Sequence, residues 1–176
     1  MGVHVVVSDT IENKVSQSSL VTIYLEDYYP KGDRVLIDIK DQLFQEIVLK
    51  EKDFRAYIND TDWSFYQDKF VALTCSVDAI VPVWAYMLLT SALEPYAKKV
   101  ILGDLNQLET SLFQEIVNEM DVTDFKDAKV VIKGCGQLPV PNSAYVSLIE
   151  KLRPIASSIM YGEPCSTVPL YKKKKQ

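Results

Sequence analysis

The stretch KFVALTCSVDAIVPVWAYMLLTSALEPYAKKVILG, residues 69–103, contains the pattern that decides the fold of this chain. It opens with an apolar run that ends at Cys75 and continues through a loop into a segment where Tyr86, Leu89 and Leu93 recur at helical spacing. A second apolar run closes the stretch. The pattern therefore predicts a strand, a loop, a helix and a second strand, the unit from which parallel α/β sheets are built.

The same pattern recurs 59 residues later, in KVVIKGCGQLPVPNSAYVSLIEKLRPIASSIMYG, residues 129–162. Nine of the 23 positions in residues 81–103 are identical to their partners in residues 140–162. A single repeat of this length is unlike a solenoid, which needs several shorter repeats. It predicts two related halves of a doubly wound sheet. The identical pairs are Val81 and Val140, Pro82 and Pro141, Ala85 and Ala144, Tyr86 and Tyr145, Leu89 and Leu148, Leu93 and Leu152, Pro95 and Pro154, Ala97 and Ala156, and Gly103 and Gly162.

The first third of the chain has a different character. Residues 19–25 and 34–39 have the composition of strands, and the turn-rich segment DYYPKGD between them predicts a β-hairpin. Residues 41–59 carry a helical pattern. The hexapeptide LFQEIV occurs at 43–48 and again at 112–117, which we interpret as a coincidence between two amphipathic helices.

These patterns predict an α/β fold, a three-layer sandwich around a mixed, mostly parallel sheet. An N-terminal β-hairpin would precede the duplicated strand-Cys-helix-strand unit. We expect an extension at residues 1–9, one domain over 10–171 that contains the repeat 69–103 and 129–162, and a basic tail at 172–176. The length of 176 residues suits a domain with a substantial core.

The chain has three cysteines, and each follows an apolar strand-like segment: KFVALTC ends at Cys75, KVVIKGC at Cys135 and SIMYGEPC at Cys165. If the three strands lie parallel in one sheet, the thiols meet at its carboxyl edge, where such sheets bind ligands. Neighbouring strands lie about 4.8 Å apart, so their tips can share one ion. We therefore expect a metal site made by Cys75, Cys135 and Cys165, with Asp78 as a possible fourth ligand.

Zinc, iron or an iron–sulfur cluster would suit these thiols. A cluster normally takes four cysteines, so it would need an outside ligand or a homodimer. The function predicted on this basis is a metal- or iron–sulfur-linked accessory protein that holds or passes on a metal species.

Two alternatives stay open. The cysteines could be buried packing residues in a protein–protein interaction module that binds through its acidic hairpin, the helix face around Trp84, or the basic tail. One cysteine could instead be the nucleophile of a small-molecule enzyme. Cys135 would then be favoured because Lys133 and glycines flank it, although His4 is the sole histidine available as a base.

Composition bears on nucleic-acid binding, membrane insertion and cellular location. The formal net charge of −5 argues against bulk attraction to nucleic acid. The longest uncharged run, Ala79 to Leu93, is shorter than the roughly 20 residues that span a bilayer, so we expect no membrane insertion. An odd number of cysteines without a CxxC pair, and no recognisable leader, predict a cytoplasmic protein with reduced thiols.

The segments LEDYYPKGDRVLIDIKD, LKEKDFR, VALTCSVDAIVPVWAYMLL, VVIKGC and GEPCSTVPLYKKK together resemble an uncharacterised bacterial domain-of-unknown-function family, family 2480. The resemblance extends from about Thr10 to the C-terminus. It implies a bacterial, cytoplasmic, single-domain protein whose three cysteines lie in family-like motifs. It also implies an association with iron–sulfur cluster assembly loci, and hence with iron–sulfur assembly proteins as partners.

Overall fold

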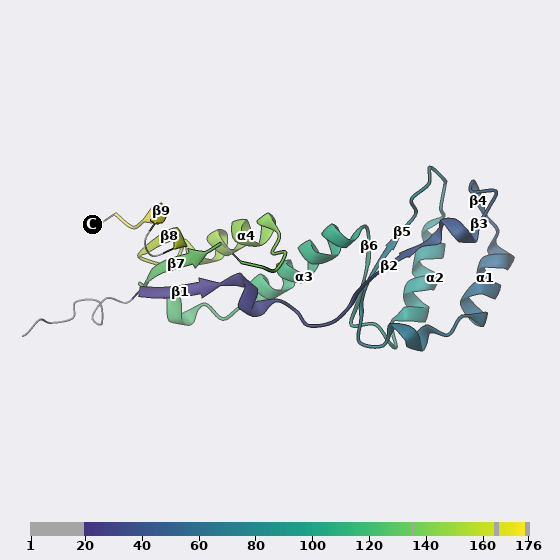
Figure 1. Cartoon of the computed structure of the whole chain (residues 1–176), viewed down its shortest axis with the longest axis horizontal. Helices are drawn as coiled ribbons and strands as arrows, with labels where there is room; N and C mark the ends of the chain where they lie inside the picture. Colours follow the sequence, from purple (N-terminus) through teal and green to yellow (C-terminus); the bar gives the residue numbers. More distant parts are fainter. Residues whose placement is uncertain (1–19, 135, 164–165, 175–176) are drawn as a thin grey trace, which may run out of the picture. The chain divides into compact units, whose positions relative to one another are not determined.

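The two copies of the repeat fold into the same order of elements. The structure is a computed structural model, and it describes residues 20–134, 136–163 and 166–174 (Figure 1). Each copy consists of a strand, a loop, a helix and a second strand parallel to the first. The first copy contains β5 (Phe70–Thr74), α2 (Val83–Leu93) and β6 (Lys99–Leu102), and the second contains β7 (Lys129–Lys133), α4 (Asn142–Leu152) and β8 (Ser158–Glu163).

The described strands form two larger sheets. In one, the strand order is β1 (Leu20–Tyr24), β7, β8 and β9 (Ser166–Lys172), and in the other it is β2 (Arg34–Asp38), β5 and β6. Neighbouring strands are parallel except that β9 runs antiparallel to β8. The predicted α/β class with mostly parallel strands is confirmed.

The predicted N-terminal hairpin was wrong. Strands β1 and β2 both exist, but β1 pairs in parallel with β7 and β2 pairs in parallel with β5. Between them the chain forms a short 3₁₀ turn, η1 (Leu25–Tyr28), and then an irregular segment. The turn-forming residues of DYYPKGD therefore allow the chain to pass from one sheet to the other.

The chain divides into two compact units. Of the described residues, one contains 20–24, 121–134, 149–163 and 166–174, and it holds the sheet of β1, β7, β8 and β9. The other contains residues 25–120 and 136–148, and it holds the sheet of β2, β5 and β6. The copies of the repeat thus contribute their strands to different units.

Helices pack on both faces of the sheet of β2, β5 and β6. Val71 and Leu73 of β5 belong to a core cluster with α1 (Glu51–Asp60) and α2, which contact each other (Figure 1). Phe70 and Ala72, which point to the opposite face of the same strand, pack against α3 (Leu105–Glu119). This unit is therefore a three-layer arrangement, and the near-continuous apolar run of β5 is explained by burial on both faces.

The repeat extends into the turns that precede each copy. Asp62 accepts a hydrogen bond from the backbone N–H of Ser64, and Asp121 accepts one from the backbone N–H of Thr123. The 3₁₀ turns η3 (Trp63–Tyr66) and η4 (Thr123–Phe125) follow these aspartates. Each turn leads to an aspartate with positive φ, Asp68 at 60° and Asp127 at 55°. The copies therefore share fine backbone geometry as well as element order.

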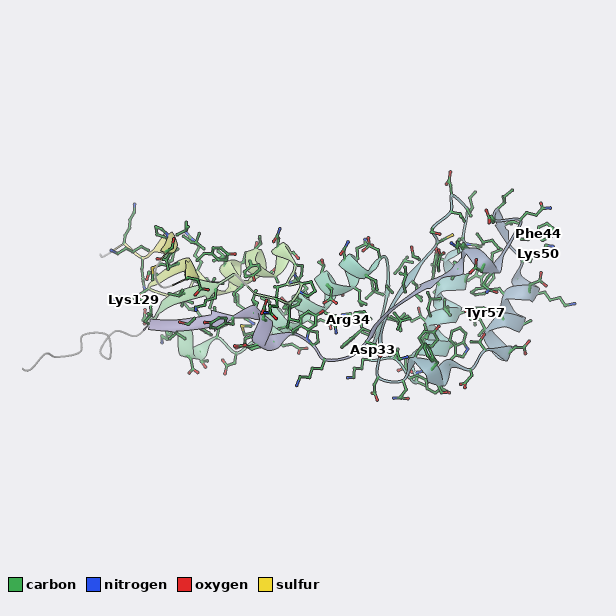
Figure 2. All side chains as sticks on the ribbon, in the orientation of Figure 1. Asp33, Arg34, Phe44, Lys50, Tyr57 and Lys129 are labelled. Atoms are coloured by element: carbon green, nitrogen blue, oxygen red, sulfur yellow. The ribbon has the colours of Figure 1, made fainter. Side chains whose placement is uncertain are left out.

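The hexapeptide LFQEIV takes two conformations. Residues 112–117 lie within α3, as predicted, whereas residues 43–48 form a hairpin of β3 (Leu43–Phe44) and β4 (Val48–Leu49) after the 3₁₀ turn η2 (Ile39–Gln42). The predicted helix over 41–59 is thus wrong before Glu51. Gln45 and Glu46 make the turn with φ of 53° and 57°. The Lys50 ammonium lies 3.2 Å from the centre of the Phe44 ring and covers it (Figure 2).

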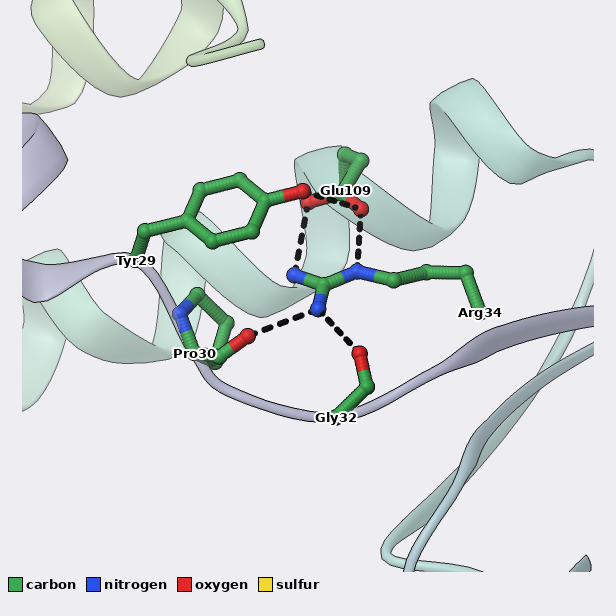
Figure 3. A network of polar contacts seen from close by, with 5 residues as sticks. All are labelled: Tyr29, Pro30, Gly32, Arg34 and Glu109. Atoms are coloured by element: carbon green, nitrogen blue, oxygen red, sulfur yellow. Dashed lines mark hydrogen bonds and ion pairs between the residues drawn. The ribbon is translucent and has the colours of Figure 1, made fainter. Parts of the chain in front are cut away.

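Arg34, the first residue of β2, anchors the segment that follows η1. Its Nε donates to Glu109 Oε1 of α3 at 2.6 Å, and its Nη2 donates to Oε2 at 3.3 Å (Figure 3). Its Nη1 donates to the carbonyls of Pro30 and Gly32. Tyr29 stacks against the guanidinium, 4.4 Å away, and donates its hydroxyl to Glu109. This network fixes the irregular segment against α3.

Of the two predicted terminal segments, only the basic one is described in part. Lys172 is the last residue of β9, and Lys173 continues the pairing through its backbone N–H to Ser157. Residues 1–9 lie outside the described residues, as does His4. Among the residues that the structure describes, no helix combines the length and apolarity needed to cross a bilayer.

Candidate functional site

The carboxyl edge of the β2–β5–β6 sheet brings together Asp38, Cys75 and Tyr86. Asp38 ends β2, and its Oδ1 accepts backbone N–H groups from Lys40 and from Ser76, each at 3.1 Å. Cys75 follows β5, and Tyr86 lies on α2. The carboxylate thus joins the ends of two neighbouring strands and fixes the loop that carries the thiol.

The surroundings at this edge shift the pKa of Asp38 and the pKa of Tyr86. Burial alone would raise the pKa of Asp38, but hydrogen bonds from Ser76 and Lys40 outweigh it and hold that pKa below its ordinary value. Burial, followed by the electrostatic influence of Cys75 and Asp38, raises the pKa of the Tyr86 hydroxyl. Tyr86 therefore remains a neutral hydrogen-bond donor at physiological pH.

Cys75 itself resembles a packing residue. It is partly buried against the core cluster of this unit, and its Sγ makes a long hydrogen bond of 3.6 Å to the Val77 carbonyl. Asp78, the predicted fourth ligand, is exposed on the same loop. Within residues 20–134, 136–163 and 166–174, no three His, Cys, Asp or Glu side chains gather as a metal site would require. Among these residues, Cys75 and Asp78 are therefore not part of a group of three such side chains.

The equivalent edge of the other sheet contains an ion pair. Lys133 ends β7 and Glu163 ends β8, and Lys133 Nζ lies 2.7 Å from Glu163 Oε2. The ammonium is also 4.7 Å from the centre of the Tyr24 ring, at the end of β1. Hydrogen bonds to Glu163 and Tyr24 raise the pKa of Lys133. Its charge is thus balanced within the edge, which weakens the argument that it activates Cys135.

The glycines beside Cys135 are closely surrounded. A Cβ on Gly134 would collide with the Tyr161 ring of β8, and a Cβ on Gly136 would collide with the Glu26 carboxylate. Glu26 also accepts the Leu138 backbone N–H at 2.9 Å. A larger residue at either position would therefore require the Tyr161 or the Glu26 side chain to move.

Cys135 and Cys165 themselves lie outside the described residues. What the structure gives is the strands that lead to them: β7 and β8 are parallel neighbours, and their last residues, Lys133 and Glu163, are paired. Cys75 follows β5, which belongs to the other sheet. The premise that the three strands preceding the cysteines lie in one sheet was therefore wrong, because β5 belongs to a different sheet from β7 and β8.

Sequence reasoning noticed Lys133 beside Cys135, but it missed that Asp38, Lys133 and Glu163 each end a strand and that Lys133 pairs with Glu163. Each is the final residue of a parallel strand, the position at which α/β sheets present functional side chains. That signal could have identified them, but only with the strand boundaries known to the residue.

The fold and these edges define a duplicated α/β protein with polar groups at the carboxyl ends of the parallel strands of two sheets. The model of the family described as "Protein of unknown function (DUF2480)" matches residues 9–173, nearly the whole chain, and the chain belongs to this family. No curated protein and no solved structure matches it.

Proposed function

We propose that the protein is a metal- or iron–sulfur-linked accessory protein of the bacterial cytoplasm that binds its metal through Cys135 and Cys165. The observation that carries this proposal is the pairing of β7 with β8, closed by the Lys133–Glu163 contact. Each cysteine lies two residues beyond one member of that pair. Two residues span at most about 7 Å, and the two strand ends from which the chain continues to the cysteines are neighbours at one edge.

The sequence predicted Cys75 and Asp78 as metal ligands, but this proposal does not include them in the ligand set. Cys75 packs against the core of the other unit and Asp78 is exposed, so neither is needed in the ligand set. Zinc prefers four ligands. Water, a carboxylate or a recipient iron–sulfur assembly protein would supply the remainder, which suits a site that transfers its metal.

The test is the metal content of the full chain, purified without oxygen and without a histidine tag. We expect bound zinc or iron, with sulfide measured alongside. Cys135→Ser and Cys165→Ser should each remove as much metal as the double variant, because a two-thiol site fails when either thiol is lost. Cys75→Ser is the matched control and should retain the metal.

Three results would count against this assignment. Metal-free wild-type protein would overturn metal binding altogether, and unchanged metal in Cys135→Ser would exclude that thiol. Loss of metal in Cys75→Ser, equal to that of the other two variants, would restore the original set of three thiols.

A second candidate, an interaction module, is favoured by one observation. The β3–β4 hairpin exposes Phe44, Ile47 and Val48, and Val48 bridges to Ile80, which is 88% exposed. Contiguous apolar side chains on a surface often mark binding sites. This candidate predicts that wild-type protein is metal-free and that its thiols react slowly with a maleimide in the native state.

A further inference from the structure

Strand β6 lies at an edge of its sheet, although its counterpart in the other copy does not. The outer side of β8 is paired with the antiparallel strand β9, whereas in the described residues β6 pairs only with β5. Unpaired strand edges present free N–H and C=O groups that readily accept another strand. The second copy therefore shows how this architecture covers the position that the first copy leaves open.

The surface beside this open edge is apolar. Val83 and Met87 of α2 are 72% and 66% exposed, and Leu102 of β6 is 62% exposed. They line a shallow hollow of about 560 Å³ that also includes Tyr86 and Glu94. At the equivalent positions of the second copy, Val83 is replaced by Asn142 and Leu102 by Tyr161. The copy without a covering strand is thus the more apolar one.

The backbone of β6 is oriented for pairing. Gly103 donates its N–H inward, to the Leu73 carbonyl of β5. Because the bonding direction alternates along a strand, Val100 and Leu102 direct their N–H and C=O groups outward. Val100 packs in the core cluster that contains α2, so Leu102, two residues on, lies on that same face of the sheet.

We propose that β6 pairs antiparallel with β6 of a second copy of this chain, joining two three-stranded sheets into one of six strands. The outward groups define the register: Val100 opposes Leu102 of the second copy, and Ile101 opposes its own counterpart on the two-fold axis. The N–H and C=O groups of Val100 and Leu102 are then exchanged in the hydrogen-bonded pairs of an antiparallel ladder. Such an interface uses the same surface on both copies.

Charge favours a second copy as the occupant. The segment KKVILGD, residues 98–104, begins with Lys98 and Lys99 and ends with Asp104. In the proposed register Lys98 faces Asp104 of the second copy at both ends of the ladder. The apolar centre is flanked by opposite charges, so the segment is complementary to itself in antiparallel orientation. The exposed apolar side chains of one copy would then be buried against those of the other, namely Val83, Met87 and Leu102.

Sedimentation equilibrium of the full-length chain tests this interface. We expect a dimer, and two variants should weaken it about tenfold or more. Met87→Lys places a charge on the exposed apolar face. Leu102→Pro removes an outward N–H that makes no bond to β5, so the sheet of each copy remains intact. Circular dichroism checks that both variants remain folded.

Val146→Lys provides the matched control. Val146 is the counterpart of Met87 in the second copy and is 62% exposed, but its β8 edge is already covered by β9. This variant should dimerise like the wild type.

A wild-type monomer throughout the concentration range would overturn the proposal, leaving a strand of another protein as the alternative occupant. A dimer that Met87→Lys and Leu102→Pro leave unchanged, or that Val146→Lys weakens equally, would place the interface elsewhere. Metal content does not enter this test, so its outcome is independent of the proposed function.

Discussion

Arg34 holds the irregular segment that precedes β2 against α3. Its guanidinium binds both oxygens of Glu109 and two backbone carbonyls, and both charged side chains are only 14% exposed. Lysine retains the charge but cannot reproduce this planar geometry. We therefore expect Arg34→Lys to lower the free energy of unfolding by about 1–2 kcal/mol, measured by urea denaturation.

Arg55 is the control for this prediction. Its Nε contacts Glu51 at 2.9 Å on the exposed face of α1. Exposed pairs of this kind contribute little, so Arg55→Lys should change stability by less than about 0.5 kcal/mol. Equal effects of the two variants would show that the Arg34 network does not stabilise the fold.

Asp38 makes a pH-dependent prediction. Its pKa is lower in the folded protein than in the unfolded chain: burial alone would raise this pKa, but hydrogen bonds from the Ser76 side chain and from the backbone N–H groups of Lys40 and Ser76 outweigh that effect. The folded state therefore binds this proton less tightly. The resulting stability is present above the unfolded pKa of about 3.9 and is lost as the pH falls through the folded pKa.

Replacement of Asp38 by asparagine should remove that pH-dependent contribution. We expect Asp38→Asn to be less stable than the wild type at neutral pH, and the difference to shrink as the pH falls below about 4. Urea midpoints of both proteins across this range measure the effect. A stability difference that is constant with pH would contradict the assigned role of the charge.

At the scale of elements, the two copies of the LFQEIV hexapeptide have the same local propensity but take different conformations, so their surroundings decide the structure. Gln45 has a positive φ in a hairpin turn, whereas Gln114, at the same place in the second occurrence, lies within α3. Glycine relieves the strain of the left-handed conformation but destabilises a helix. Gln45→Gly should therefore raise the free energy of unfolding by about 1 kcal/mol, and Gln114→Gly should lower it by about 1 kcal/mol. Changes of the same sign would contradict the two conformations.

The elements that sequence predicted best are those with strong local signals. The Pro82 and Pro141 positions mark the starts of α2 and α4, and the 59-residue offset correctly related β5 with β7 and β6 with β8. The 41–59 helix failed in its first part because LFQEIV has a helical pattern that a tight turn overrides. Pattern alone could not predict that turn, since neither Gln45 nor Glu46 is a usual turn residue.

At the scale of the molecule, the sequence patterns did not predict which strands pair with each other. β1 and β2 are close in the chain, but each pairs with a strand far along it, and no local pattern encodes that choice. The same limit applies to the site: the strands that precede the cysteines were identified correctly, but the sequence did not show which sheet each of those strands joins. The sequence therefore predicted the repeated unit better than the assembly.

The division into two sheets without a common strand predicts two cooperative units of unfolding. Val71 and Val130 are equivalent, fully buried residues of β5 and β7, each of which is an inner strand of its sheet. Replacement of either by alanine should cost about 2 kcal/mol through lost burial and a residual cavity. In native-state hydrogen exchange, Val71→Ala should lower protection of amides in β5 and β6, and Val130→Ala that of β7 and β8, because local units open with their own free energies. If either variant lowered protection equally in both sheets, the two halves would unfold as one, and the duplication would have produced a single cooperative structure.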